Sequence, residues 1–181
     1  MPMKRRALAA AALSLPFAAR GVQAAQPDGG LPRLREVARP AAAVVFQDAE
    51  GRERDLSSFN GRGLVVNLWA TWCPPCVAEM PALDRLAALV AAEGIEVLAL
   101  SSDRGGRAVV EGFYTRTGVA RLGVWLDPRG AAARGLGVRA LPTTVIVDRA
   151  GMERARLEGE AEWDHPAMLA AVRRLVEPAR G

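Results

Sequence analysis

Apolar residues along the chain form two kinds of segment: short continuous runs and longer stretches with helical spacing. The short runs have the length of buried β-strands and occupy residues 64–69, 95–101, 123–126, 143–148 and 152–157. The helically spaced stretches occupy residues 74–92, 107–117 and 131–136, and a last one ends near residue 176. Two further strands, at residues 43–46 and 53–56, flank a turn and predict a β-hairpin ahead of the other elements.

This order of elements predicts one α/β domain over residues 43–178, in which helices flank a central mixed sheet and the N-terminal hairpin is an extension. Pro81 lies inside the helix predicted at residues 74–92 and is expected to kink it. Asp164 is expected to cap the last helix. Residues 26–42 are rich in Pro, Gly, Ala and Arg, and they predict a linker or a loosely packed arm.

Residues 1–25 have the parts of a secretory signal peptide. Residues 4–6 (Lys-Arg-Arg) give a positively charged start, residues 7–19 are apolar, and small residues follow them. The apolar part is too short for a transmembrane helix, which needs about 20 residues. The sequence therefore predicts export to the periplasm, by the Sec or the twin-arginine route. The alternative is an uncleaved leader that anchors the protein to the membrane.

The net positive charge of the chain comes entirely from this leader. The chain has 181 residues and a formal net charge of +4, with 24 basic and 20 acidic residues. Four basic residues and no acidic ones fall within residues 1–25, so the remaining chain has 20 of each kind. A balanced chain lacks the basic surface that nucleic-acid binding requires, and we expect no nucleic-acid partner.

The chain has only two cysteines, Cys73 and Cys76, and Pro74 and Pro75 separate them. They lie where a predicted strand is followed by a predicted helix, which is the context of a redox disulfide. At the N-terminus of a helix, free N–H groups and the helix dipole can lower a cysteine pKa from about 8.5 to ~3.5–7.5. Cys73 is therefore the expected nucleophile, and the more buried Cys76 is expected to resolve the mixed disulfide. Trp72 is expected to shield Cys73 and to offer clients an apolar contact.

Two other interpretations of the cysteine pair compete with a redox disulfide. A tetrahedral zinc site needs two more ligands, and His165 is the only histidine in the chain. Zinc is therefore disfavoured, whereas Cu(I), which accepts two thiolates, remains an alternative. A purely structural disulfide would stabilise the fold little, because it closes a very short loop. Redox chemistry without a metal or another cofactor is the favoured interpretation.

Leu141, Pro142 and Thr143 form a second candidate site, ahead of an apolar strand. If the peptide bond before Pro142 is cis, the turn exposes backbone groups of Leu141 beside the sulfurs. These groups could then pair with an extended substrate as an added strand. The alternative is an ordinary proline at the start of a strand, since only about 5–6% of X–Pro bonds are cis in folded proteins.

Glu79 is the third candidate, three residues after Cys76 on the same predicted helix. This spacing places the two side chains on roughly the same face. A buried carboxylate there would have a raised pKa and could relay protons during thiol exchange. A solvated glutamate in the first turn of the helix is an equally good interpretation of the spacing alone.

The motifs together resemble the thioredoxin superfamily, and within it the exported TlpA/ResA/CcmG-like branch. The residues that carry the resemblance are WATWCPPC at 69–76, Glu79-Met80-Pro81, Gly137-Val138 and LPTT at 141–144. The resemblance covers about residues 44–177 and implies a thioredoxin fold with Pro142 cis against the disulfide. It also implies that Cys73 attacks, that Cys76 resolves, and that Glu79 is an acidic residue of the active site. Asn67 stands where thioredoxin itself carries a buried aspartate.

The resemblance further implies an enzyme of the protein-disulfide reductase type. Members of this branch mostly reduce client proteins, such as apocytochrome c or copper-site proteins of cytochrome oxidase. Their electrons come from a membrane protein of the DsbD/CcdA type. A disulfide-donating oxidase and a copper-handling chaperone remain alternatives, because the same residues serve either direction of electron transfer. We expect the protein to be a monomer.

Overall fold

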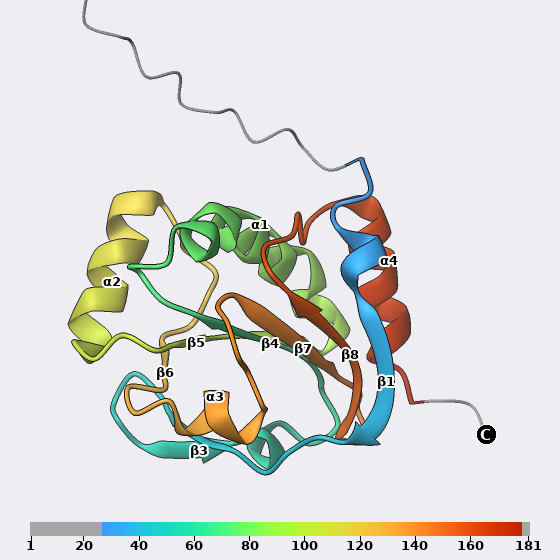
Figure 1. Ribbon diagram of the computed structural model, residues 1–181, viewed down its shortest axis with the longest axis horizontal. Coiled ribbons are helices and arrows are strands. Elements are labelled where there is room, and N and C mark those ends of the chain that lie inside the picture. Colours follow the sequence, from blue (N-terminus) through green and yellow to red (C-terminus); the bar gives the residue numbers. More distant parts are fainter. Residues whose placement is uncertain (1–26, 179–181) are drawn as a thin grey trace, which may run out of the picture.

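The computed structural model describes residues 27–178, which form an eight-stranded mixed sheet with helices on both faces (Figure 1). The strands are β1 (Arg35–Pro40), β2 (Val45–Gln47), β3 (Glu53–Asp55), β4 (Gly63–Trp69), β5 (Ile95–Ser101), β6 (Trp125–Leu126), β7 (Thr143–Val147) and β8 (Met152–Glu158). The α-helices are α1 (Pro74–Val90), α2 (Gly106–Thr117), α3 (Ala131–Gly135) and α4 (Pro166–Leu175). Short 3-10 turns are η1 (Leu31–Arg33), η2 (Leu56–Phe59) and η3 (Ala91–Glu93). The predicted α/β class is confirmed.

Strand β4 is at the centre of the sheet, whose strand order is β1-β8-β7-β4-β5-β6-β2-β3. It runs parallel to β5 and antiparallel to β7. Every residue of β4 is buried, because helices cover both faces of the sheet, and this explains its continuous apolar run. The predicted hairpin consists of β2 and β3, which reach the sheet through the pairing of Gln47 with Leu126.

Successive side chains of β4 enter two separate cores, one on each face of the sheet. Val65 and Trp69 pack with residues of α1, α2 and α4. Leu64, Val66 and Leu68 pack with residues of α3 and the hairpin. Figure 1 shows the same division, with α1 and α2 above the sheet and α3 below it. Both ends of the loop from β4 to α1 are therefore fixed by packing.

The segment predicted as a linker, residues 26–42, contains a strand instead. β1 pairs antiparallel with β8 and forms one edge of the sheet. Arg39 donates two hydrogen bonds of 3.0 Å to the carboxylate of Glu153, whose side chain is only 2% exposed. Most residues of β1 are exposed, so the strand has no apolar pattern of its own. Its structure depends on a partner strand more than 100 residues later in the chain, as the separation of 114 residues between Arg39 and Glu153 illustrates.

The predicted cap of the last helix is wrong by one residue. The N-cap of α4 is His165, whose side chain accepts a hydrogen bond from the backbone N–H of Ala167. Asp164 instead accepts a hydrogen bond of 2.6 Å from Arg85 on α1. The acidic residue therefore joins two helices, and the neighbouring imidazole takes the capping position.

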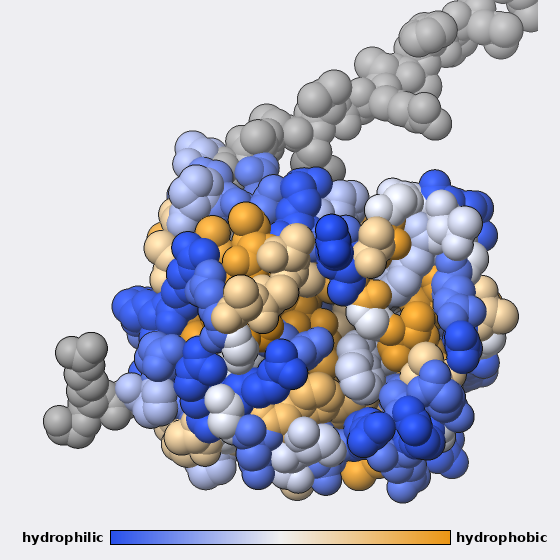
Figure 2. Space-filling model, turned by 180° about the vertical axis from the view of Figure 1, so that it is seen from behind, coloured by the Kyte–Doolittle hydropathy of each residue, from blue (hydrophilic) through white to orange (hydrophobic). Residues whose placement is uncertain are grey.

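The signal peptide predicted for residues 1–25 lies outside the described residues. Within residues 27–178, no helix combines the length and the apolar character needed to cross a membrane. The surface seen from behind carries hydrophobic residues in separate patches among hydrophilic ones (Figure 2). Apolar side chains on that face therefore reach the surface in limited areas.

The ion pair that holds β1 leads to a stability prediction. We expect Glu153→Gln to lower the free energy of unfolding by about 3 kcal/mol, because it leaves the buried Arg156 without a charged partner. Glu158→Gln is the matched control, since this residue lies on the same strand but is exposed and pairs with exposed Arg35. We expect the control to change stability by less than about 0.5 kcal/mol. Urea denaturation measures both, and equal losses would contradict the importance of the buried pair.

Candidate active site

Two segments distant in sequence meet at the carboxyl end of β4. β4 ends immediately before the loop that carries Cys73. β7 begins at Thr143, and the antiparallel register places Thr143 opposite Leu68, near the end of β4. The preceding peptide bond, between Leu141 and Pro142, is cis, as the family resemblance implied. The structure thus brings the cis-proline segment to the same end of β4 as the cysteine loop.

A buried carboxylate that the sequence analysis did not single out holds the start of this loop. Asp103 is 4% exposed and follows β5, the parallel neighbour of β4. It accepts hydrogen bonds from the backbone N–H of Thr71 at 2.9 Å and from the Thr71 hydroxyl at 2.7 Å. It also accepts one of 2.8 Å from the hydroxyl of Ser101. The position of Asp103 could have been anticipated, because parallel neighbouring strands end at the same edge of a sheet.

Cys73 and Cys76 form a disulfide across the first turn of α1, with their Cα atoms 5.3 Å apart. Cys73 is the N-cap residue, and its Sγ accepts a hydrogen bond of 3.4 Å from the backbone N–H of Cys76. Pro74 and Pro75 occupy the first turn of the helix, where a missing N–H costs little. The sulfur of Cys73 therefore lies where the helix dipole favours a thiolate once the disulfide is reduced.

The two cysteines differ in their access to solvent. Cys76 is fully buried, whereas Cys73 is 5% exposed. Trp72 is 67% exposed, and Pro74 and Pro75 are exposed as well. A partner protein therefore meets an apolar rim around Cys73, and it reaches Cys73 before Cys76. This order agrees with the expected roles of attack for Cys73 and resolution for Cys76.

The backbone of Leu141 is open to a partner. Leu141 precedes β7, and within residues 27–178 its N–H and C=O make no hydrogen bond. The segment around it is nevertheless fixed. The carbonyl of Pro142 accepts a hydrogen bond of 2.8 Å from the N–H of Gly159, and the hydroxyl of Thr143 donates one of 2.7 Å to the carbonyl of Ala140. Leu141 therefore presents two polar backbone groups in a defined orientation.

Glu79 is buried, at 3% exposure, so the interpretation as a solvated glutamate is wrong. Its Oε1 accepts a hydrogen bond of 2.7 Å from Nδ2 of Asn67 on β4. Its Oε2 accepts one of 2.9 Å from Nε1 of Trp163 and one of 3.1 Å from the backbone N–H of Ala161. The carboxylate thus connects α1, which also carries Cys76, to β4 and to the segment between β8 and α4.

Burial raises the pKa of Glu79 to about 7, because a desolvated carboxylate is less stable when charged. The hydrogen bonds from Trp163, Asn67 and Ala161 act in the opposite direction, since they stabilise the charged form. Nearby Glu160 raises the pKa further through charge repulsion. Glu79 therefore changes its protonation near neutral pH, within the helix that carries both cysteines. A group of this kind is suited to exchange protons with reacting thiols.

Asn67 holds the carboxylate of Glu79 from β4. Its Nδ2 donates to Glu79 and also, at 2.9 Å, to the hydroxyl of Thr144 on β7. Its Oδ1 is buried and has no hydrogen-bond partner within residues 27–178. Asn67 therefore faces Glu79 with a donor, where a second carboxylate would repel it.

Sequence reasoning missed the contribution of the C-terminal segment to this site. Trp163 is not among the candidate residues named from the sequence, and its ring is fully buried. The hydrogen bond between Trp163 and Glu79 joins residues 84 positions apart. No local pattern indicates such a contact, because it depends on how α4 docks against α1.

A zinc site at the cysteine pair would need further ligands, of which His165 is the only histidine. His165 lies at the start of α4, where its Nδ1 accepts the capping hydrogen bond of 3.2 Å from Ala167. Across residues 27–178, no group of three or more His, Cys, Asp and Glu side chains is arranged to hold a metal ion. His165 therefore has a structural role at the helix end.

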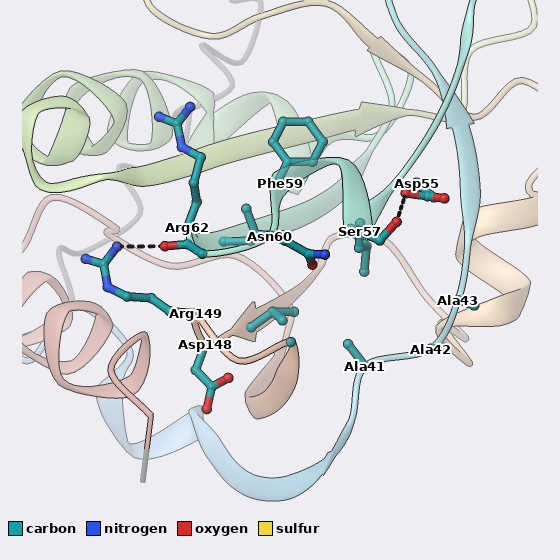
Figure 3. Close-up of a pocket in the computed structure, with 15 residues that line it drawn as sticks. Ala41, Ala42, Ala43, Asp55, Ser57, Phe59, Asn60, Arg62, Asp148 and Arg149 are labelled. Atoms are coloured by element: carbon teal, nitrogen blue, oxygen red, sulfur yellow. Dashed lines mark hydrogen bonds between the residues drawn. The ribbon is translucent and has the colours of Figure 1, made fainter. Parts of the chain in front are cut away.

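A cavity of about 230 Å³ lies at the other end of the sheet, around the start of β4 and the end of β7 (Figure 3). Polar groups that line it make hydrogen bonds within the fold. Arg149 donates to the carbonyl of Gly61 at 3.3 Å, and the hydroxyl of Ser57 donates to Asp55 at 2.6 Å. The cavity is separate from the cysteine pair and adds nothing to its chemistry.

A disulfide at the start of a helix, with a cis-proline segment at the same end of the central strand, defines the thioredoxin-fold thiol–disulfide oxidoreductases. Comparison with known proteins agrees with this class. The Redoxin family matches residues 36–172. The thiol-disulfide oxidoreductase ResA of Bacillus thuringiensis subsp. konkukian is 32% identical over 125 residues, which cover 69% of this chain and 71% of that protein. ResA of Geobacillus thermodenitrificans is 33% identical over 123 residues, covering 68% and 70%.

Solved structures share the fold. A protein of Chlorobium tepidum described as the thiol:disulfide interchange protein DsbE aligns with a TM-score of 0.67 and 23% identity, covering 78% of this chain and 99% of that one. The chain therefore belongs to the Redoxin family, and it is a thiol–disulfide oxidoreductase similar to ResA. Thiols or disulfides of other proteins are the clients of this class.

The buried carboxylate predicts a pH dependence of stability. The folded chain holds the proton of Glu79 more tightly than the unfolded chain, so this group lowers the free energy of unfolding as pH rises from 4.5 towards about 7. Glu79→Gln has no proton to lose there. Relative to wild type, it should gain up to about 3 kcal/mol of stability between about pH 5 and about pH 8. Denaturation of the disulfide-bonded proteins measures this, and a pH-independent difference would contradict the burial of a titrating carboxylate.

The hydrogen bond that Trp163 donates to Glu79 predicts an effect of this tryptophan on the pKa of Glu79. Trp163→Phe keeps an aromatic ring but removes the N–H that stabilises the charged carboxylate. We expect the pKa of Glu79 to rise by about one unit, followed by NMR titration of its side-chain carboxyl carbon. Trp125→Phe is the matched control, because the buried Nε1 of Trp125 has no hydrogen-bond partner within residues 27–178. An unchanged titration in Trp163→Phe would show that this hydrogen bond does not act on Glu79.

Proposed function

We propose that the protein is an exported reductant, which transfers two electrons from the reduced Cys73–Cys76 pair to a disulfide of a client protein. In the first step the Cys73 thiolate attacks one client sulfur and releases the other as a thiolate. In the second step the Cys76 thiolate attacks the sulfur of Cys73, releases the second client thiolate and forms the Cys73–Cys76 disulfide. The client takes up the one proton that Cys76 loses and one from water, and it leaves with two thiols. Glu79 is proposed to accept the proton that Cys76 loses before it attacks.

The buried carboxylate of Glu79 is the observation that supports this direction of electron transfer. Residues three apart on a helix have Cβ atoms roughly 5–6 Å apart, so Glu79 lies close to Cys76. A negative charge there disfavours a thiolate on Cys76. Strong oxidants of this class owe their potential to a stabilised reduced form, and Glu79 acts against that stabilisation. The hydrogen bond from Cys76 N–H to Cys73 Sγ, by contrast, stabilises a thiolate on Cys73. This contact favours the reduced form and is the observation that supports the oxidase alternative.

Clients are proposed to bind across the open backbone of Leu141. An extended client segment can pair with the free N–H and C=O of Leu141 as a short added strand. Its reactive sulfur then lies over Cys73, and the exposed ring of Trp72 provides an apolar contact beside it. Pro74, Pro75 and Thr143 complete the proposed contact surface.

The partners and the location are proposed from the resemblance. The clients would be apocytochrome c before haem attachment, or copper-site proteins during assembly of cytochrome oxidase. A membrane dithiol donor of the DsbD/CcdA type would reduce the disulfide again. The protein would act as a monomer in the periplasm, reached through the signal peptide predicted at residues 1–25.

Trapping of mixed disulfides tests the proposal. In Cys76→Ser the second step is blocked, so we expect clients to accumulate on Cys73 and to be released by added dithiothreitol. Cys73→Ser is the matched control and should trap at least about tenfold less, because the buried Cys76 is the poorer nucleophile. Folded Cys76→Ser protein that traps no client, or equal trapping by the two variants, would contradict the proposed roles.

A further inference from the structure

An open cleft of about 600 Å³ lies beside the exposed ring of Trp72. Its lining consists of Trp72, Ser102, Arg104, Pro128, Arg129 and Gly130. These residues belong to the loops that follow β4, β5 and β6. These three strands run parallel to one another, so the loops meet at the edge of the sheet where Cys73 also lies. The cleft is therefore next to the reacting sulfur.

The cleft carries positive charge that the fold leaves unbalanced. Arg104 and Arg129 are both exposed. Neither side chain makes a hydrogen bond or an ion pair within residues 27–178, and no carboxylate lines the cleft. Many other arginines within residues 27–178 form an ion pair with a carboxylate. Arg154, for example, pairs with Asp148 at 3.1 Å.

The acidic residues closest in sequence are directed into the protein. Asp103 is 4% exposed and accepts hydrogen bonds from the Thr71 loop and from Ser101, as described above. Asp127 is 2% exposed and accepts hydrogen bonds of 3.1 and 2.9 Å from the backbone N–H groups of Ala132 and Ala133. Both carboxylates accept hydrogen bonds inside the fold, so the outer surface of the cleft presents guanidinium groups beside an aromatic ring.

We propose that this cleft binds acidic side chains of the client polypeptide, next to the client's reactive cysteines. The occupant is a polypeptide because the cleft adjoins Cys73 and Trp72, over which an extended client passes when it pairs with Leu141. Carboxylates fit because Arg forms charge-assisted and bidentate hydrogen bonds with them. The proposal rests on the reductase function proposed above and specifies which clients that function favours.

Three peptides of equal length test this selectivity. Each contains one disulfide, flanked by aspartate, by asparagine or by lysine. The measured quantity is the second-order rate constant with which the reduced protein reduces each peptide. At low ionic strength we expect the aspartate peptide to react about 10-fold faster than the asparagine peptide, and the lysine peptide to react more slowly than both. The preference should shrink as salt is added, because the charges are exposed.

The variant Arg104→Gln/Arg129→Gln separates client binding from an effect on the cysteines themselves. We expect the ratio of the aspartate to the asparagine rate constant to fall from about 10 to below about 3. Arg116→Gln is the matched control. Arg116 is exposed, lacks an ion-pair partner within residues 27–178 and lies roughly 15 Å along α2 from Gly106. It should keep the wild-type ratio.

Other outcomes would overturn the proposal. A wild-type protein that reduces the asparagine peptide as fast as the aspartate peptide has no acidic selectivity, although its reductase function stands. Equal slowing of all three peptides in the double variant would mean that the arginines act on the Cys73 thiolate and not on clients. A wild-type protein that reduces none of the peptides would remove the proposed function, and the client preference with it.

Discussion

The burial of the Glu79 carboxylate is the constraint on which the architecture of this site depends. A buried carboxylate is costly unless hydrogen-bond donors surround it. Here the donors come from Asn67 on β4 and from Ala161 and Trp163 ahead of α4. The helix that carries the cysteines is thereby tied to the central strand and to the C-terminal segment. The position of the disulfide is thus set by contacts far apart in the sequence.

The same carboxylate gives the two cysteines different environments. The helix N-terminus favours negative charge on Cys73, whereas Glu79 opposes it on Cys76. In the proposed reaction the reduced pair therefore holds one thiolate, at the accessible sulfur, and one thiol, at the buried sulfur. This distribution matches the order of the two exchange steps. Because burial raises the pKa of Glu79 to about 7, this carboxylate is a better proton acceptor for Cys76 than an ordinary glutamate.

Features encoded locally could be predicted from the sequence. The apolar run of β4 and the helical spacing after Cys73 gave the strand and helix that flank the disulfide, and the resemblance implied the cis bond before Pro142. Long-range contacts could not be predicted. β1 has no apolar pattern of its own and becomes a strand through its pairing with β8. The spacing of Glu79 from Cys76 could not show whether its carboxylate is buried or solvated. Its burial depends on a contact with Trp163, 84 residues later in the chain.

The reduction potential of the Cys73–Cys76 pair is the most direct test of the proposed direction of electron transfer, because a poorly stabilised dithiol is a good electron donor. Equilibration with a glutathione or dithiothreitol redox buffer at neutral pH gives this value. We predict a potential near that of thioredoxin, about −270 mV, or more negative. A potential near about −120 mV would indicate a disulfide donor and would contradict this prediction.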